Sequence, residues 1–231
     1  MQINHPGKQS PKGLNAQNVS PSAIPFGKEL APFFDPPREL THQEILDIIK
    51  RFGTTAAIAQ KAGFTGVQIH GAHGYLVSQF LSERHNKRTD QWGGNAENRR
   101  RFVLEVYAEM RKQVGDKFPI GIKLNSADFQ KGGFSEEESL DVIRALSEAG
   151  IDMIEISGGT YEAPVMAGTK KMPIKESTRR REAYFLEFAE KARQATKTPL
   201  MVTGGFRSPE GMNEAINSGA VDFVGIARAL A

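Results

Sequence analysis

The chain has 231 residues, of which 39% are hydrophobic and 25% are charged, a balance typical of a globular protein and not of a disordered one. No apolar run reaches the roughly 18 to 20 residues that span a bilayer, and the N-terminus "MQINHPGKQS" lacks the apolar stretch of a secretory signal. The absence of cysteine excludes disulfides, thiolate-held iron–sulfur clusters and cysteine-bound zinc within this chain. We therefore expect a soluble, cytoplasmic protein without membrane contact.

The charge is mildly basic, with a formal net charge of +3 and an isoelectric point near 9.1. Arginines cluster over residues 99–101 and 179–181. Aromatic residues do not interleave with these charges, as they do in many nucleic-acid-binding surfaces. We therefore interpret the clusters as solvated or salt-bridged helix surface and expect no nucleic-acid partner.

Short apolar runs alternate with helix-length segments along most of the chain, which is typical of an α/β protein with a parallel sheet. Residues 1–5, "MQINH", form a weaker candidate for an opening strand. The clearer predicted strands are 66–70, 119–125, 152–157, 199–205 and 222–227.

Capping boxes mark two helix starts, because a Thr or Ser and a Glu three residues later can satisfy each other's backbone N–H groups. The boxes stand at Thr41–Glu44 and Ser135–Glu138, and Ser208 before a proline marks a third start. Gly150 and Gly219 can close the second and third of these helices in the left-handed conformation.

Two α/β architectures compete, a doubly wound open sheet and a closed (β/α)8 barrel of the TIM type. The open sheet usually carries G-x-G-x-x-G after its first strand, and the early glycines of this chain do not make that motif. Small residues instead follow the last two strands, where barrels commonly hold a phosphate. The candidate phosphate-binding residues are Gly204, Gly205, Gly225, Ala227 and Arg228.

The barrel that we favour is incomplete, since the chain supplies about six of the eight strand–helix units. Either the architecture is unusual or both ends of a larger domain are missing. We treat residues 1–231 as one partial barrel domain.

Two histidines and a tyrosine follow the predicted strand 66–70 on one turn: His70, His73 and Tyr75. A zinc site would need a third ligand, and its histidine pair usually lies four apart on a helix, so we expect no metal. Two imidazoles could instead donate hydrogen bonds to a substrate oxygen that gains negative charge, and the phenol could deliver a proton. The alternatives are loop histidines bonded to backbone and a tyrosine that only anchors the next helix.

Lys123 lies inside a predicted strand, where a charge is costly unless it has a partner or faces the barrel mouth. Three roles fit it equally: a Schiff-base nucleophile, a cation beside an anionic cofactor, or a structural lysine paired with Glu155 on the next strand. Gln2, on the opening strand, offers an amide at the same mouth.

The stretch "RTDQWGGNAENRRRF" combines turn residues with a helix start near Asn95 or Asn98. We interpret it as a loop held by interactions of Arg88, Asp90 and Arg99 and not as a part of the chemistry, although Trp92 could line the site.

These segments together resemble the old yellow enzyme family of flavin-dependent oxidoreductases. The resemblance runs in order along the whole chain and is most specific in its second stretch. The matching stretches are "QINHPGKQS", "GVQIHGAHGYLVSQFLSERHNKRTDQWGGNAENRRRF", "PIGIKLN", "ISGGTYE", "VTGGFRS" and "VGIARAL".

The resemblance implies a (β/α)8 barrel that binds FMN, is reduced by NADH or NADPH, and reduces an alkene conjugated to a carbonyl. It implies that Gln2 contacts the flavin pyrimidine edge and that Lys123 lies near flavin N1 and O2. His70 and His73 would bind the substrate oxygen, and Tyr75 would protonate the α carbon. The implied phosphate-binding residues are Gly204, Gly205, Gly225, Ala227 and Arg228.

The chain also departs from the family, because the first two barrel strands and the final helix have no counterpart in it. Open strand edges would pair with another chain or with a second copy. Two alternatives to the ene-reductase follow: a truncated, inactive fragment or interaction protein, and a nonredox lyase that uses Lys123 as a Schiff base.

Overall fold

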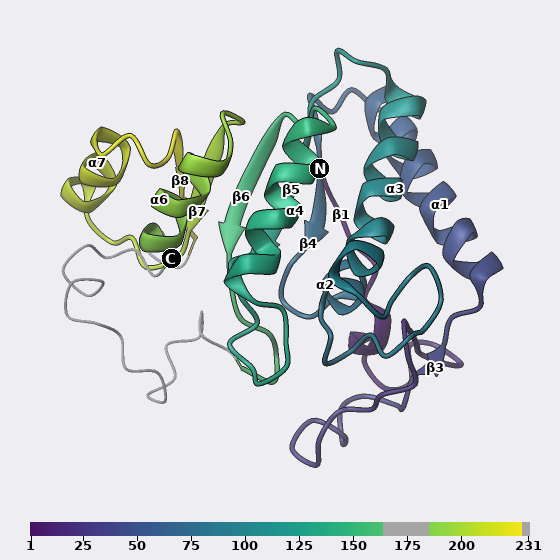
Figure 1. Cartoon of the computed structure of the whole chain (residues 1–231). Helices are drawn as coiled ribbons and strands as arrows, with labels where there is room; N and C mark the ends of the chain where they lie inside the picture. The colour runs from purple at the N-terminus through teal and green to yellow at the C-terminus, as the bar shows by residue number, and fades with distance from the viewer. Residues whose placement is uncertain (164–184, 228–231) are drawn as a thin grey trace.

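A computed structural model describes residues 1–163 and 185–227 of the chain (Figure 1). Its central feature is a sheet of six strands, every neighbouring pair of which is parallel. In spatial order the strands are β1 (Gln2–Ile3), β4 (Val67–Gly71), β5 (Ile120–Asn125), β6 (Met153–Ser157), β7 (Leu200–Thr203) and β8 (Phe223–Gly225). All six predicted strands are therefore present, the weak candidate at the N-terminus included.

The order of the strands distinguishes the two architectures that competed at the level of sequence. A doubly wound sheet reverses its strand order at a switch point, whereas a barrel adds each new strand on the same side. The six strands follow one another in chain order with no reversal. The sheet is therefore of the barrel type, with β1 and β8 at its edges within the described residues.

Helices follow the strands and begin largely where the sequence predicts. Those described are α1 (His42–Lys61), α2 (Leu76–Leu81), α3 (Ala96–Val114), α4 (Glu136–Glu148), α6 (Leu186–Ala195) and α7 (Pro209–Asn217), with a 3-10 turn η1 (Gly7–Gln9). None of these helices is both long and apolar enough to cross a membrane. The arginines of residues 179–181 lie outside the described part of the chain.

The predicted capping boxes are confirmed. The Thr41 hydroxyl accepts from the Glu44 N–H at 3.3 Å, and the Thr41 N–H donates to the Glu44 carboxylate at 2.9 Å. Ser135 makes the same reciprocal pair with Glu138. Gly150, just beyond α4, has a φ of 89° and so takes the left-handed conformation that the sequence predicts.

The two faces of the sheet differ in chemistry because side chains alternate along each strand. One face carries apolar side chains that join the helices in a continuous hydrophobic core. Ile69, Ile122 and Ile154 are paired in register across β4, β5 and β6, and none of them is exposed to solvent. The other face carries polar side chains and leads to the candidate site.

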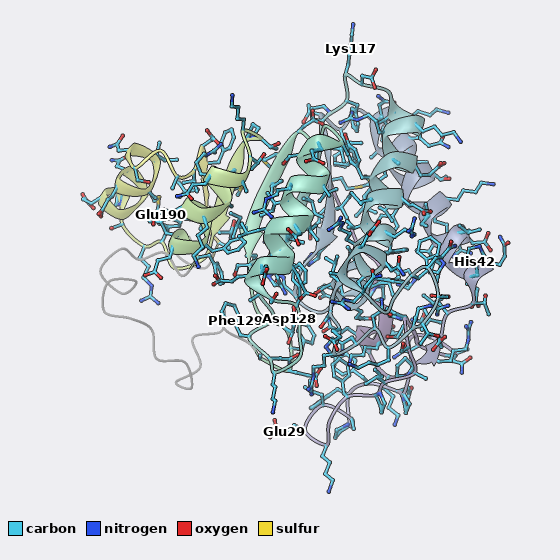
Figure 2. All side chains as sticks on the ribbon, in the orientation of Figure 1. Glu29, His42, Lys117, Asp128, Phe129 and Glu190 are labelled. Atoms are coloured by element: carbon cyan, nitrogen blue, oxygen red, sulfur yellow. The ribbon has the colours of Figure 1, made fainter. Side chains whose placement is uncertain are left out.

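Loops at the carboxyl ends of the strands gather at one end of the sheet. In Figure 2, Asp128 and Phe129 lie at this end, after β5, and Lys117 lies at the opposite end, before β5. The segment after β1 also lies at the carboxyl end and contains a short parallel pair, β2 (Val19–Ser20) with β3 (Arg38–Glu39), which the sequence did not predict.

The loop that precedes α3 is structural, as expected. The Arg88 guanidinium donates to the Asp90 carboxylate at 2.6 Å and also contacts Glu39 at 3.1 Å. Asn95 caps α3 by accepting from the Asn98 N–H at 2.8 Å. The suggestion that Trp92 lines the site is wrong, because its ring is fully buried in the core and its N–H donates to His42 at 2.9 Å.

Replacing Ile122 with alanine should lower the free energy of unfolding by roughly 2 to 5 kcal/mol, because it opens a cavity between the sheet and its helices. Ile58, which is 62% exposed on α1, offers a matched control. The Ile58→Ala variant should unfold within about 0.5 kcal/mol of the wild type. Urea denaturation followed by circular dichroism measures both, and equal effects of the two substitutions would contradict the assigned orientation of β5.

Candidate active site

Strand register places a row of polar side chains on the face of the sheet opposite the helices. Gln2 pairs with Gln68, and Lys123 pairs with Glu155, so these four side chains point to the same side. Gln2 Nε2 donates to Gln68 Oε1 at 2.7 Å, and Gln68 Nε2 donates to Glu155 Oε2 at 2.7 Å. Thr203 on β7 donates its hydroxyl to Glu155 Oε1 at 2.5 Å. The row thus forms one connected network across five strands.

Lys123 pairs with Glu155, as one of its three predicted roles required. Its ammonium lies 2.8 Å from Glu155 Oε1, and the two side chains are 16% and 7% exposed, respectively. Burial alone would raise the pKa of the Glu155 carboxyl. The hydrogen bond and positive charge of Lys123, aided by the Thr203 and Gln68 donors, outweigh burial and lower that pKa. The pair therefore stands as a carboxylate beside an ammonium.

The two histidines lie on the turn that follows β4, with ring centroids 5.2 Å apart and planes nearly perpendicular. His70 is at the end of the strand and is buried. Its Nδ1 accepts from the Ala72 N–H at 3.4 Å, which favours the tautomer that carries its proton on Nε2. The predicted convergence of two imidazoles from one turn is present in the structure.

His73 takes a backbone conformation that is uncommon for a residue with a side chain, with a φ of 61°. Neighbouring elements hold it there. Its N–H donates to Asn125 Oδ1 at 3.2 Å, and its carbonyl accepts from Gln9 Nε2 at 3.2 Å. Its ring Nε2 lies 2.8 Å from the Ser157 hydroxyl. The backbone of His73 is therefore held by β5 and η1, and its ring is held by β6.

Both imidazoles are neutral near pH 7. Burial lowers the pKa of His70 to about 3, with further lowering from the charges of His73 and Lys123. Burial and the Lys123 charge lower the pKa of His73 to about 4. A neutral imidazole carries one N–H donor and one acceptor nitrogen, so each ring can offer a hydrogen bond without adding a full positive charge.

Tyr75 lies beside the histidines at the start of α2, with its ring centroid 4.8 Å from that of His70. Its hydroxyl is 2.9 Å from the hydroxyl of Tyr161, a residue for which the sequence predicts no role. Burial and then the Tyr161 hydrogen bond raise the pKa of Tyr75 to about 12. Tyr75 therefore keeps its proton at neutral pH.

The proposed phosphate turns lie at the carboxyl ends of β7 and β8. Gly204 and Gly205 have φ values of 121° and 96°, which side-chain-bearing residues rarely adopt. A Cβ on Gly225 would clash with the Thr203 hydroxyl, so only glycine fits there without displacing the polar network. Ala227 follows at the surface, and Arg228 lies outside the described residues.

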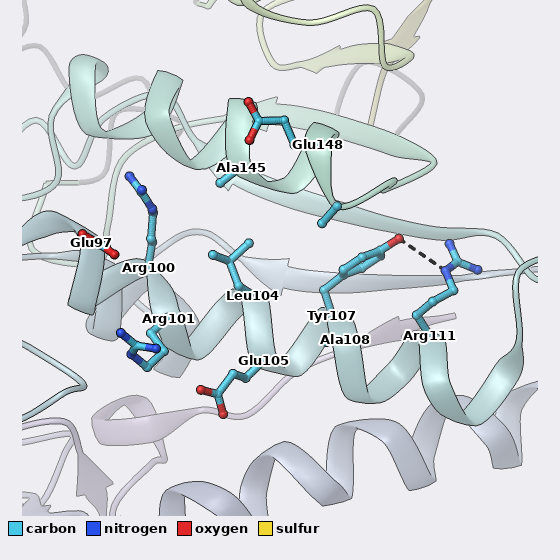
Figure 3. Close-up of a pocket in the computed structure, with 11 residues that line it drawn as sticks. Glu97, Arg100, Arg101, Leu104, Glu105, Tyr107, Ala108, Arg111, Ala145 and Glu148 are labelled. Carbon is cyan, nitrogen blue, oxygen red and sulfur yellow. Dashed lines mark hydrogen bonds between the residues drawn. The ribbon is translucent and has the colours of Figure 1, made fainter.

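A groove of about 700 Å³ opens between α3 and α4 (Figure 3). It contains Tyr107, whose hydroxyl accepts from Arg111 at 3.3 Å. The groove lies on the helical side of the sheet, and the polar row lies on the other side. Across residues 1–163 and 185–227 no three metal-binding side chains gather closely enough to hold an ion.

Comparison with known proteins identifies the family of this chain. The model of the NADH:flavin oxidoreductase / NADH oxidase family matches residues 1–231. The chain belongs to this family. Family membership confirms the resemblance drawn from the sequence and, with it, the expected FMN and NADH-type reductant.

Two relatives with curated names illustrate the match. The NADH-dependent flavin oxidoreductase iliE of Hypocrea jecorina (strain QM6a) is 40% identical over 246 residues, which cover 99% of this chain and 60% of that protein. The NADH oxidase of Thermoanaerobacter brockii is 36% identical over 100% of this chain and 34% of its own length. The chain thus spans between a third and two thirds of these relatives.

Solved structures agree on the fold. A 2-naphthoyl-CoA reductase in complex with 2-naphthoyl-CoA superposes with a TM-score of 0.83 at 29% identity, over 98% of this chain and 35% of that chain. An old yellow enzyme homologue from Zymomonas mobilis gives 0.77 at 24% identity, over 97% and 61%. The likeness confirms the predicted fold class, a partial (β/α)8 barrel.

The described residues fit FMN. Gln2 is exposed at one end of the polar row, so its amide is available to a ring edge, and the partly exposed Lys123 supplies a cation on the same face. Gly204 and Gly205, which follow β7, have positive φ values and precede the N-terminus of α7, where Ser208 caps the helix by accepting from the Gly211 N–H at 3.2 Å, and a helix N-terminus can bind an anion.

Sequence reasoning missed Gln68, Thr203 and Tyr161. Gln68 and Thr203 are polar residues in otherwise apolar strands, and that alternation was the signal that could have revealed a polar face. Tyr161 stands in the quoted stretch "ISGGTYE", but nothing local indicates that its hydroxyl meets Tyr75, which is 86 residues earlier.

The two histidines should make the protein less stable in mild acid. Their folded-state pKa values of about 3 and about 4 lie below the unfolded value of 6.5, so the unfolded state binds protons first as the pH falls. Stability should fall from pH 6.5 downward by about 1.4 kcal/mol per pH unit for each histidine. Urea denaturation between pH 5 and 8 measures the free energy of unfolding of the wild type and of the His70→Asn/His73→Asn variant. This free energy should change less steeply with pH in the variant, and equal slopes would contradict the neutral assignment of the histidines.

Proposed function

We propose that this chain forms the FMN-binding barrel of an NAD(P)H oxidoreductase that reduces an alkene conjugated to a carbonyl. The proposal is carried by one observation, the pair of neutral imidazoles that converge beside a protonated tyrosine at the carboxyl end of β4. Bound FMN would supply the hydride that it takes from NAD(P)H. The remaining tasks, which are binding, orientation and protonation, fall to residues of this chain.

The histidines are suited to hold the substrate carbonyl. A carbonyl conjugated to an alkene gains negative charge on its oxygen when hydride adds to the β carbon, and N–H donors held in place stabilise that charge. The rings of His70 and His73 are fixed by bonds to Ala72 and Ser157, which limits the reorganisation needed when the charge appears. Tyr75, on the same turn, would then donate its proton to the α carbon.

The cofactor would be held by the residues of the polar row and the last two turns. Gln2 would bind the pyrimidine edge, and Lys123 would place positive charge near flavin N1 and O2. Glu155 keeps Lys123 in position, because the 2.8 Å ion pair and the strand register fix the ammonium on that face. The candidate phosphate ligands remain Gly204, Gly205, Gly225, Ala227 and Arg228. We further propose that residues 1–231 act as one FMN-binding domain in the cytoplasm.

The other functions considered from the sequence are less well supported. A Schiff-base lyase needs a neutral lysine amine, and Lys123 is held against a buried carboxylate whose own pKa is lowered. An inactive fragment or an interaction protein has no need for a fixed pair of imidazoles with a phenol beside them. An activated alkene therefore remains the proposed substrate class, and pairing through the strand edges or with a second copy remains a secondary proposal.

Phenol binding tests the histidines directly, because a phenolate resembles the charged oxygen of the reacting substrate. In the FMN-loaded protein, His70→Ala/His73→Ala should weaken binding of para-hydroxybenzaldehyde by about a hundredfold or more, since it removes two hydrogen bonds to a charged oxygen. A titration followed through the long-wavelength charge-transfer absorbance measures the affinity. His42→Ala, on the helical side of the sheet, is the control and should bind as the wild type does.

Unchanged phenol affinity in the double variant would contradict the proposed role of the histidines. A wild type that retains no FMN after removal of free flavin would contradict the larger proposal that this chain forms the cofactor site.

A further inference from the structure

A second phenol accompanies the proposed proton donor. Tyr161 lies on the loop after β6, and its hydroxyl oxygen is 2.9 Å from that of Tyr75. The ring centroids are 5.9 Å apart, and the planes meet at 69°. The contact joins two segments that are 86 residues apart in the chain, so it depends on the fold of the barrel and not on local sequence.

The residues on either side of Tyr161 are fixed to the rest of the site. Thr160 forms a parallel bridge with His73, which couples this loop to the histidine turn. The Glu162 carboxylate lies 3.5 to 3.6 Å from three cationic or titratable groups, those of Lys8, Arg84 and His85. Lys8 and His85 are buried. Tyr161 is therefore held in place between two anchored neighbours.

The Tyr161 side chain also connects the site to water. It is 44% exposed and lines an open pocket of about 610 Å³ with residues that include Arg84, Gln130 and Glu162. Tyr75 is more buried, and burial is the first cause of its raised pKa. Tyr161 is therefore the more solvent-exposed of the two phenols.

We propose that Tyr161 is a positioning residue that also returns a proton to Tyr75 during alkene reduction. This inference rests on the proposed function above. Tyr75 alone would be a weak acid in its half-buried position, because the phenolate that it leaves behind is poorly solvated. While Tyr75 holds its proton, it donates to Tyr161, and this hydrogen bond helps to keep its pKa high. Once that proton leaves, the 2.9 Å contact lets the Tyr161 hydroxyl donate to the phenolate oxygen and stabilise it.

The transfer balances without any further reactant. The alkene receives its two electrons as hydride at the β carbon, with NAD(P)H as the ultimate reductant. The Tyr75 O–H bond breaks while the new C–H bond forms at the α carbon. The Tyr161 O–H bond breaks while an O–H bond forms again at Tyr75, and water returns a proton to Tyr161. Neither tyrosine changes its oxidation state.

The contact can be tested without cofactor or turnover. The chain has four tyrosines, so labelling them with ¹³C at Cζ gives a spectrum that single Tyr→Phe variants assign. Tyr161→Phe should shift the Tyr75 resonance, because Tyr75 loses its hydrogen-bond partner. The Tyr107 resonance is an internal control, since the hydroxyl of Tyr107 contacts Arg111 and should not move. An unmoved Tyr75 resonance would overturn the proposal.

Kinetics of the FMN-loaded protein test the relay itself. Tyr161→Phe should slow reoxidation by 2-cyclohexenone about tenfold. Reduction by NADH and the affinity for para-hydroxybenzaldehyde should match the wild type, because the histidines are unchanged. In mixtures of H₂O and D₂O the wild-type rate should curve with deuterium content, as expected for two protons in flight, and the variant should give a straight line. Tyr107→Phe is the matched control and should behave as the wild type.

The outcomes separate the relay from the function on which it rests. Equal slowing of both half-reactions in Tyr161→Phe, or a curved dependence that persists in it, would mean a structural role only and would overturn the relay. A wild type whose reduced cofactor is never reoxidised by the alkene would overturn the proposed function before any variant is compared.

Discussion

The site depends on one buried carboxylate, that of Glu155. A charge taken out of water costs several kcal/mol unless nearby donors and an opposite charge replace the lost hydration. Lys123 on β5 and Thr203 on β7, the two strands next to β6, provide that replacement. Gln68 on β4, one strand farther away, adds a third donor. Because each partner reaches Glu155 along the same face, the network fixes the register of four strands while it holds a cation at the open side of the sheet.

The same cation sets the state of the histidines. Burial is the largest cause of their lowered pKa values, and the Lys123 charge lowers both further. Hydrogen bonds with Asn125 and Gln9 also hold His73 at its positive φ. A strained backbone of this kind persists only where the surrounding structure maintains it. The polar row and the histidine turn are therefore one electrostatic unit, so changes in Lys123 reach the imidazoles.

The sequence predicts the parts of this structure that depend on local patterns. Buried strands appear as apolar runs, and the boxes at Thr41 and Ser135 mark helix starts, because both signals lie within a few residues. Trp92 was assigned wrongly because a turn-rich loop does not reveal which way a side chain faces. The Tyr75–Tyr161 contact and the β2–β3 pair join distant segments, and only the folded chain brings them together.

In the proposed reaction, the protonation states would give a different task to each group on the turn. A charged imidazole beside the substrate oxygen could pass its proton to that oxygen and leave the α carbon unprotonated. With pKa values of about 3 and about 4, His70 and His73 have no such proton to give near neutral pH, so they can bind the oxygen without neutralising it. Tyr75, whose pKa is raised to about 12, still holds its proton and would give it to the α carbon in the proposed reaction. Burial thus acts in opposite directions on the two residue types, and it separates the group that stabilises charge from the group that removes it.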